Sequence, residues 1–366
     1  MSLKRSDSVK KQNILILTAS FGMGHKSVSN AIKEQIELKN SDLNIEIVDI
    51  LDILNPALKD VGSKIYYNLT EHYPIVYNTI YDIKKSNKNN IFDSLLCNTY
   101  YKKLYNYINS MSPSLIISTF PLCSCAVSKV KKEYGTDIKL VTVITDIVDS
   151  WEWLYEGTNM YMVPSQDIKD KLIDKGIDKD IIEVTGIPVK NSFMNKNNVN
   201  KDTLLIIATG MTEYDLSHNM LKQLDTCSGL KTVIVTGRNE VLYAKLSKKL
   251  YKDITILGFV DNIDKLMDEA VFLVTKPGGI TVFEAINKEL PLVIKDTKIG
   301  QEKGNVEFIK RNNLGIVINN NKDLLKIVSD YIQNPYKTNK LCKNISEVKK
   351  KLKPHKVAEC ILENVN

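Results

Sequence analysis

Short runs of aliphatic and β-branched residues alternate with helix-like patterns along most of the chain, and this alternation limits the fold more than any other feature. Apolar strands separated by helices are typical of parallel βαβ units. A first series of expected strands covers residues 13–18, 44–50, 114–118, 139–144, 159–163 and 181–184. A second series covers residues 203–208, 231–236, 254–257, 271–275, 291–294 and 315–318. The pattern predicts two doubly wound, Rossmann-like α/β domains that face each other across a cleft.

The two series are separated by a polar, Asn-rich stretch, residues 190–202, which lacks hydrophobic periodicity as linkers do. We therefore expect an N-terminal domain over residues 13–195 and a C-terminal domain over residues 196–336. The preceding residues 1–12 are expected to be disordered. The final residues 337–366 read as helices, and we expect them to pack back on the N-terminal domain.

Basic and aromatic residues gather in one part of the first domain. Residues 59–132 contain ten Lys against four acidic residues, and nine of the seventeen tyrosines. No convincing strand appears in residues 55–110, which predicts a helical excursion there. This composition suits an anionic membrane surface, although a solvated helical face with core tyrosines explains it equally well. The net charge of +7 is moderate, and we expect no nucleic-acid partner.

Several kinds of protein are disfavoured by what the sequence lacks. Its apolar stretches fall short of the roughly 20 residues that a membrane-spanning helix needs. The first residues lead directly into a strand, without the apolar core of a signal peptide. The six cysteines form no CxxC pair and have no His at metal spacing. We expect a cytoplasmic protein with reduced thiols and no metal site.

A glycine loop joins the first expected strand to a helix. A P-loop does not fit, because His25 interrupts the GxxxxGK[ST] spacing. Gly22-x-Gly24-x-x-Ser27, followed by Asp49 after the next strand, resembles a dinucleotide fingerprint, although its third position is not Gly. In a further interpretation His25 is a general base, since the pKa of imidazole is close to neutral. A dinucleotide-dependent oxidoreductase and a group-transfer enzyme both remain open here.

The most specific segment is Thr275–Ala285, a strand that ends in a Pro-Gly-Gly turn and continues as a helix. Free N–H groups at such a helix start bind phosphate oxygens, assisted by the helix dipole. Glu284 lies about one turn further and can accept hydrogen bonds from both ribose hydroxyls. The segment predicts a nucleoside diphosphate held by Lys276, Pro277, Gly278, Gly279, Ile280, Thr281 and Glu284.

A second candidate segment, Gly300-Gln-Glu-Lys-Gly-Asn305, opens another helix after the next expected strand. Gln301 and Glu302 offer a donor and acceptor set suited to sugar hydroxyls. A plain turn and a plain helix cap would explain each segment separately. The order of the two segments, both beyond the carboxyl ends of neighbouring strands, favours one shared binding site.

These motifs resemble those of the monogalactosyldiacylglycerol synthases and the processive diacylglycerol glucosyltransferases, and more distantly the peptidoglycan N-acetylglucosaminyl transferase. The resemblance rests on Thr275–Ala285 with Gly300–Asn305, and on the glycine loop ending at His25. Val143-Ile-Thr-Asp146 and Thr185-Gly-Ile-Pro188 match at similar spacing. The resemblance implies a GT-B fold, a UDP-sugar as co-substrate, no required metal or other cofactor, and inverting transfer to a membrane acceptor.

The resemblance also assigns roles by position. It implies catalysis by His25, assisted by Asp146. It implies a donor site that adds Gly210, Phe259, Val260, Gln301, Glu302 and Asn305 to the seven residues of the phosphate and ribose site. It implies an acceptor and membrane region formed by Gly22, Gly24, Tyr66, Tyr73, Pro74, Tyr77 and Tyr81.

The expected reaction transfers glucose or galactose from UDP to a lipid, with diacylglycerol as the expected acceptor, at the inner face of the cell membrane. Two loops depart from the family pattern: Ala208–Glu213 carries an acidic residue near the expected diphosphate, and Ile147–Trp151 lacks a His. A nucleotide-sugar-binding protein that has lost turnover therefore stands as an alternative, beside the oxidoreductase.

Overall fold

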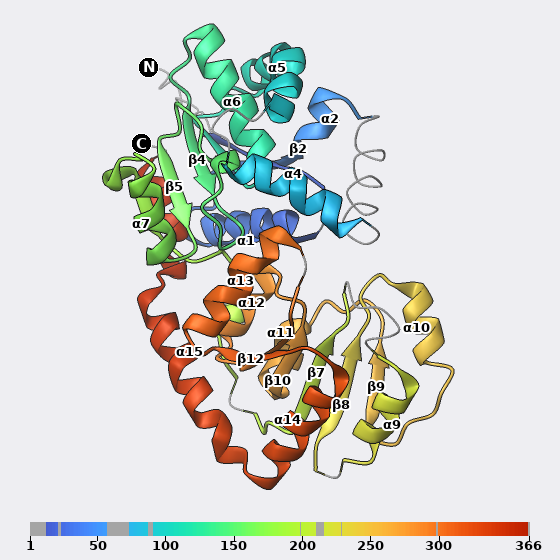
Figure 1. Cartoon of the computed structure of the whole chain (residues 1–366). Coiled ribbons are helices and arrows are strands. Elements are labelled where there is room, and N and C mark those ends of the chain that lie inside the picture. Colours follow the sequence, from blue (N-terminus) through green and yellow to red (C-terminus); the bar gives the residue numbers. More distant parts are fainter. Residues whose placement is uncertain are drawn as a thin grey trace, which may run out of the picture.

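The computed structural model describes residues 12–20, 23–56, 73–86, 91–197, 199–209, 216–227, 229–297 and 299–364. The chain forms two α/β domains, drawn one above the other in Figure 1. Each domain contains one six-stranded sheet in which neighbouring strands are parallel. The predicted fold class is therefore confirmed, and each strand end lies within one residue of its expected position.

The N-terminal sheet has the strand order β2-β1-β3-β4-β5-β6. Its strands are β1 (Asn13–Thr18), β2 (Asn44–Asp49), β3 (Leu115–Ser118), β4 (Lys139–Val143), β5 (Met160–Val163) and β6 (Ile182–Val184). Helices cover both faces of this sheet, so the central strands must be apolar on both sides. Accordingly, Ile14, Leu15, Ile16 and Leu17 of β1 are all fully buried.

The C-terminal sheet has the strand order β12-β11-β10-β7-β8-β9. Its strands are β7 (Thr203–Ile207), β8 (Lys231–Val235), β9 (Ile254–Leu257), β10 (Ala270–Thr275), β11 (Leu292–Lys295) and β12 (Gly315–Ile318). The strand order reverses between β7 and β10, as it does between β1 and β3 in the other sheet. Ligands of open α/β sheets bind at such switch points, beyond the carboxyl ends of the strands.

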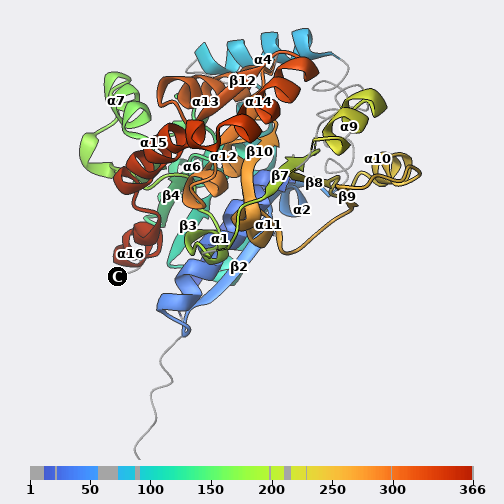
Figure 2. The same ribbon diagram turned by 90° about the horizontal axis from the view of Figure 1, so that it is seen from below.

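Helices connect the strands and pack on both faces of the sheets (Figure 2). The described helices of the N-terminal domain are α1 (Met23–Lys39), α2 (Ile50–Leu54), α4 (Pro74–Ser86), α5 (Ile91–Met111), α6 (Pro121–Tyr134), α7 (Gln166–Asp174) and α8 (Asn191–Met194). Those of the remaining chain are α9 (His218–Asp225), α10 (Glu240–Leu246), α11 (Ile263–Glu269), α12 (Gly279–Asn287), α13 (Gly300–Arg311), α14 (Asn321–Gln333), α15 (Asn339–Lys351) and α16 (Val357–Glu363). Within the expected helical excursion, the described part contains helices and no strand.

Local sequence signals explain where several helices begin and end. The Ser165 side chain accepts a hydrogen bond from Ile168 N–H at the start of α7. At the start of α14, Asn320 and Asp323 form a capping box. Helix α6 ends at Gly135, whose φ of 62° suits the residue that follows a helix. No helix in the described ranges has the length and apolar composition of a membrane span.

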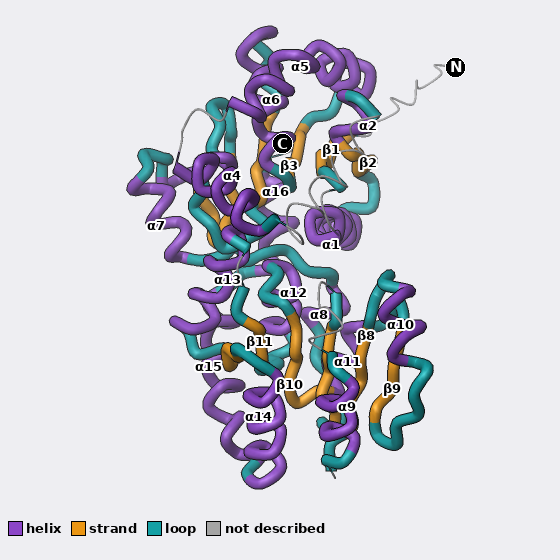
Figure 3. Tube along the Cα trace, turned by 45° about the vertical axis from the view of Figure 1, so that its right-hand side comes forward, coloured by secondary structure: helices purple, strands orange, loops and turns teal. Residues whose placement is uncertain are grey.

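The C-terminal helices join the two domains. Helix α15 runs along the C-terminal domain, and α16 lies against α1 of the N-terminal domain (Figure 3). Val357, Ala358 and Ile361 of α16 are buried in this contact region. At the edge of the contact between α1 and α16, Lys39 Nζ lies 2.6 Å from Glu359 Oε1. The chain therefore crosses between the domains a second time, so both crossings constrain their relative position.

Candidate active site

His25 lies where three neighbouring strands of the N-terminal sheet end. It follows β1, and its ring contacts Thr119 after β3 and Thr145 after β4. His25 Nδ1 is 3.0 Å from the Thr119 carbonyl oxygen and 2.9 Å from Thr145 Oγ1. Because β1, β3 and β4 are adjacent in the sheet, their carboxyl ends bring these residues together. The ring is thus held by backbone and hydroxyl groups at the topological switch point.

The hydrogen bonds of His25 determine which nitrogen can act as a base. A carbonyl oxygen can only accept a hydrogen bond, so Nδ1 carries the proton that Thr119 receives. Nε2 then keeps its lone pair. Phe120 packs edge-on against the ring with centroids 4.9 Å apart. Desolvation lowers the pKa of His25 to about 4, although the bond to Thr119 opposes this shift. The imidazole is therefore neutral at physiological pH, as a general base must be.

Asp146 lies on the loop after β4 and faces the C-terminal domain. Its Oδ1 accepts a hydrogen bond from Asn305 Nδ2 at 3.2 Å, and its carboxylate also accepts one from Gly279 N–H. Desolvation raises the pKa of Asp146 to about 7, and the nearby Glu302 carboxylate raises it further. The bonds from Asn305 and Gly279 and the charge of Lys276 act in the opposite direction.

The expected assistance of Asp146 to His25 is not direct in this structure. Among the hydrogen bonds of the described residues, none joins the two side chains. The ring of His25 is oriented instead by Thr119 and Thr145. Asp146 belongs to the interface with α12 and α13. Thr119 was missed by sequence reasoning, although its position directly after a β-strand beside β1 was the available signal.

Four amides at the start of α12, those of residues 278–281, were expected to bind phosphate. Two of them have partners within the protein. Gly278 N–H donates to the Lys276 carbonyl at 2.8 Å, and Gly279 N–H donates to Asp146. For Ile280 and Thr281 N–H, no backbone acceptor is found among the described residues. These two amides are therefore available to an anion. The amide of Gly279 already faces the Asp146 carboxylate.

Close packing explains why Gly279 must be a glycine. A Cβ atom at this position would lie 2.5 Å from the Thr145 carbonyl oxygen and 2.8 Å from Asp146 Oδ1. At Gly278 a Cβ atom would meet no atom within 4 Å. Across the same interface, a Cβ atom at Gly24 would lie 4.0 Å from Ile280 Cγ2. The two predicted glycine segments therefore face each other across the domain boundary.

Glu284 lies one turn into α12, as expected for a ribose-binding carboxylate. Its side chain is half-buried, and no hydrogen bond or ion pair to it occurs within the described part of the chain. Desolvation raises the pKa of Glu284 to about 8, with a smaller contribution from Asp264 and an opposing one from Lys190. A carboxyl group without a protein partner at this position is suited, once ionised, to accept hydroxyl hydrogens.

Glu302 is only 5% exposed and already has partners inside the protein. Lys276 Nζ lies 3.4 Å from Glu302 Oε1, and Thr297 Oγ1 donates to Oε2 at 2.9 Å. Lys276 thereby connects the turn before α12 with the first turn of α13. Gln301 beside it is half-buried. The pair lies where the sequence placed it, with Glu302 held in a fixed position.

Asn305 was expected to contact the donor, and in the structure its side chain has partners within the protein. The side chain is fully buried. Its Nδ2 donates to Asp146 and, at 2.8 Å, to the Pro277 carbonyl, while its Oδ1 accepts from Ile147 N–H at 2.9 Å. Both amide hydrogens and the amide oxygen are therefore used within the protein. Asn305 joins the two domains and holds the Pro-Gly-Gly turn.

Two other residues expected at the donor site, Phe259 and Val260, lie at the carboxyl end of the same sheet. Phe259 follows β9 and is 57% exposed. The Arg238 guanidinium, after β8, lies 5.4 Å from the centroid of its ring. Val260 is half-buried. Gly210 lies outside the described residues, as does most of the loop that contains it.

The residues expected at the acceptor and membrane region divide into different environments. Tyr73 is 62% exposed, whereas Tyr81 is 6% exposed and packs against Gly300 of the C-terminal domain. Tyr81 is therefore buried between the two domains, and its expected role in the acceptor and membrane region stays a prediction. Pro74 and Tyr77 belong to α4. The expected residues Gly22 and Tyr66 lie outside the described residues.

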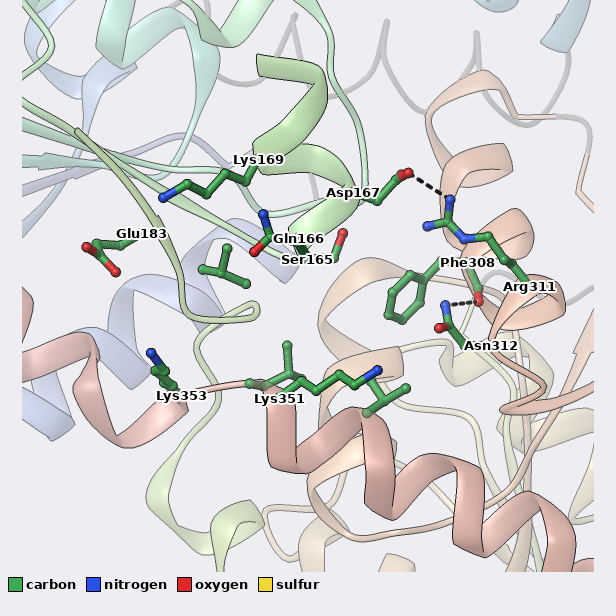
Figure 4. Close-up of a pocket in the computed structure, with 13 residues that line it drawn as sticks. Ser165, Gln166, Asp167, Lys169, Glu183, Phe308, Arg311, Asn312, Lys351 and Lys353 are labelled. Atoms are coloured by element: carbon green, nitrogen blue, oxygen red, sulfur yellow. Dashed lines mark hydrogen bonds and ion pairs between the residues drawn. The ribbon is translucent and has the colours of Figure 1, made fainter. Parts of the chain in front are cut away.

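Two cavities lie elsewhere at the domain boundary. One of them, about 450 Å³, is lined by residues of α7, the end of α13 and the end of α15 (Figure 4). Asp167 and Arg311 line both this cavity and the second one, of about 490 Å³, and Arg311 Nη1 lies 2.8 Å from Asp167 Oδ1 (Figure 4). Neither is lined by a predicted site residue. Within the described ranges, no group of three or more His, Cys, Asp or Glu side chains could hold a metal ion.

Comparison with known proteins gives two family matches that adjoin each other. Residues 25–189 match the monogalactosyldiacylglycerol (MGDG) synthase family model, and residues 187–360 match the glycosyltransferase family 28 C-terminal domain. A processive diacylglycerol beta-glucosyltransferase from Staphylococcus carnosus is 26% identical over 96% of this chain and 93% of its own. The protein of that name from Bacillus licheniformis is 28% identical over 92% and 91%.

Solved structures share the fold at low sequence identity. MurG from Acinetobacter baumannii has a TM-score of 0.60 at 11% identity, covering 97% of this chain and 99% of its own. Anabaena Alr3699/HepE, determined in complex with UDP-glucose, has a TM-score of 0.56 at 14% identity, covering 96% and 99%. These similarities show the GT-B arrangement of two facing domains.

Proposed function

From the membership of this chain in the glycosyltransferase family of the MGDG synthases and processive diacylglycerol beta-glucosyltransferases, we propose that it transfers glucose or galactose from a UDP-sugar to diacylglycerol. The product is a glycolipid. The family match and the relatives' names support a lipid acceptor. The complex of HepE with UDP-glucose supports a UDP-sugar as co-substrate.

The geometry that carries this proposal is a neutral imidazole facing an anion-binding helix start across the domain boundary. His25 Nε2 takes the proton of the acceptor hydroxyl as that oxygen attacks the anomeric carbon. The bond between this carbon and the diphosphate oxygen breaks, and UDP leaves with the bonding electrons. Because attack and departure occur on opposite faces, the configuration inverts.

The leaving diphosphate gains negative charge, which must be stabilised where it develops. In this proposal the amides of Ile280 and Thr281 and the dipole of α12 supply that stabilisation, with Lys276 nearby. Glu284 accepts the ribose hydroxyls. Gln301 and Glu302, in the first turn of α13, lie beside the hexose. No metal ion is required for these contacts.

Helix α4 supports peripheral binding to the membrane. Three of its apolar side chains are exposed: Ile75 is 81% exposed, and Val76 and Ile83 are about half-exposed. Lys85 lies on the same helix, and Tyr73 is the residue directly before the helix. Apolar and aromatic side chains with nearby lysines bind the headgroup region of anionic lipids. We place the protein on the inner face of the cell membrane by this helix.

The test is incubation of the protein with UDP-glucose or UDP-galactose and vesicles that contain diacylglycerol and an anionic lipid. We expect UDP release and a new glycolipid with one of the two donors. UDP binding with neither release nor glycolipid would instead favour a binding protein that has lost turnover. A nicotinamide signal on titration with NADH would favour the oxidoreductase alternative, which the relatives do not support.

A further inference from the structure

Helix α4 has two sides with different contacts. At 100° per residue, Asn78, Tyr81 and Lys85 fall on one side, and Ile75, Val76 and Ile83 fall on the other. The first side faces protein, because Tyr81 is buried while Lys85 and Asn78 bond to other segments. The second side consists of the exposed apolar side chains described above. A single helix thus connects the outer surface with the protein interior.

The inner side of α4 completes the start of α13, the helix that contains Gln301 and Glu302. Gly300 N–H donates to Asn78 Oδ1 at 2.7 Å. The residue at the cap position of α13, Ile299, supplies no side-chain cap. The first amides of a helix need an acceptor from outside the helix, and Asn is among the preferred ones. Asn78 supplies this acceptor from the other domain, across 222 residues of sequence.

Two further contacts hold α4 in this position. A Cβ atom at Gly300 would lie 2.6 Å from Cδ1 of Tyr81, so the ring packs directly on the backbone where α13 begins. Lys85 Nζ lies 3.9 Å from Asp149 Oδ1, on the loop that contains Asp146. Helix α4 therefore contacts both the acceptor-side loop and the first turn of the donor-side helix.

We propose that Asn78 is a positioning residue that transmits membrane binding of α4 to the sugar end of the donor site. This inference rests on the proposed function. A membrane that binds the Ile75, Val76 and Ile83 side holds α4 in one orientation. Asn78 then fixes Gly300 and, with it, Gln301 and Glu302. Membrane binding has then already removed the conformational freedom of this contact. The hexose loses less entropy on binding, so it binds more tightly to the membrane-bound enzyme.

The contacts of α4 described above reach the start of α13 and the loop after β4, whereas the diphosphate and ribose are expected to bind at α12, so the effect should be larger for the sugar. We expect anionic phosphatidylglycerol vesicles without diacylglycerol to tighten binding of the hexose donor, UDP-glucose or UDP-galactose, by about fivefold or more. UDP affinity should change less than twofold. Titration calorimetry with and without vesicles measures both values.

Asn78→Ala should lose this vesicle response while still binding vesicles in a sedimentation assay. Asn78→Asp should keep it, because a carboxylate can accept the Gly300 hydrogen bond. Thr79→Ala is the matched control, since Thr79 lies on the same helix and its Oγ1 donates to the Ile75 carbonyl of that helix. An Asn78→Ala protein with an unchanged vesicle response would overturn the proposal. So would vesicles that tighten binding of UDP as much as binding of the hexose donor.

A second variant makes the test independent of the stability of Asn78→Ala. Ile83→Asp places a charge on the exposed side and leaves the inner contacts intact. Without vesicles, this variant should bind the hexose donor with the affinity of the wild type. Adding vesicles should not raise that affinity. A full vesicle response in Ile83→Asp would contradict the proposal. If the wild type binds neither UDP-glucose nor UDP-galactose, the proposed function is wrong. If it binds a donor but shows no vesicle response, only the inference about Asn78 is wrong.

Discussion

The side-chain amide of Asn305 donates to Asp146 Oδ1 at 3.2 Å, and so connects α13 of the C-terminal domain to the loop after β4 of the N-terminal domain. Asp146 in turn accepts from Gly279 N–H at the start of α12. A carboxylate therefore occupies one of the amides expected to bind the diphosphate. In the proposed reaction, the arriving diphosphate competes with the Asp146 carboxylate for the Gly279 N–H and displaces it.

Replacing Asp146 by Asn should make stability less dependent on pH. The folded-state pKa of about 7 lies above the ordinary value of 3.8, so this carboxyl favours the folded state at low pH. That contribution is lost as pH rises through about 7. Asp146→Asn should therefore gain free energy of unfolding relative to wild type as pH rises from 5 to 8. We expect about 1 kcal/mol, since the half-buried group is partly screened.

Urea unfolding of both proteins at pH 5 and pH 8 measures this difference. Asp137→Asn, on the surface before β4, is a control that should show no such trend. A stability difference between Asp146→Asn and wild type that stays constant across this range would show that Asp146 has an ordinary pKa.

His25→Ala should lower turnover by roughly 10²- to 10⁴-fold, the usual contribution of a general base. UDP affinity should stay within about twofold, because the α12 contacts remain. Initial rates of glycolipid formation and UDP titration measure the two effects. His218→Ala is a suitable control, since His218 bonds to Tyr251 in the other domain. Wild-type turnover in His25→Ala would remove this residue from the chemistry.

Glu284→Gln should weaken UDP binding in a pH-dependent manner. The ionised carboxylate accepts the ribose hydroxyls, and its pKa of about 8 in the free protein means that UDP binding expels a proton below that pH. Wild-type affinity should therefore rise between pH 7 and pH 9. The Gln variant should lack this rise and bind about tenfold more weakly at pH 9. In 2′-deoxy-UDP one ribose hydroxyl is absent, so wild type should lose affinity for it and the variant should not.

Gly279→Ala and Gly278→Ala form a matched pair. The first adds a Cβ atom 2.5 Å from the Thr145 carbonyl oxygen, whereas the second adds one with no neighbour within 4 Å. Gly279→Ala must push the two domains apart at this contact. We expect its thermal midpoint, measured without donor, to fall by several degrees and that of Gly278→Ala to stay close to wild type. Equal midpoints would mean that the contact is not maintained in solution.

Some of the site could be predicted because it depends on local order. Lys276–Glu284 must lie at the end of a strand and the start of a helix, since the apolar run and the Pro-Gly-Gly turn require it. The role of Asn305 could not be predicted this way. Its side chain is used by Asp146 and Pro277, and only tertiary packing determines which of these groups reach it.

Tyr81 and Asn78 show the same limit. A basic, Tyr-rich segment predicts a surface helix, and the exposed Ile75 and Val76 agree with that expectation. The segment alone does not tell which side of the helix faces the other domain. Gly300 and Tyr81 are more than two hundred positions apart, and their contact arises from the closure of the two domains.

The two parallel sheets and the strand–turn–helix segment expected to bind the nucleotide could be predicted from the sequence, because strand and helix periodicity and glycine turns are local properties of the chain. The partners of His25, the contact between Asp146 and Gly279 and the capping of α13 by Asn78 arise from tertiary packing. Strand order and domain closure bring these groups together. Both depend on the packing of whole sheets and helices, which no short segment encodes.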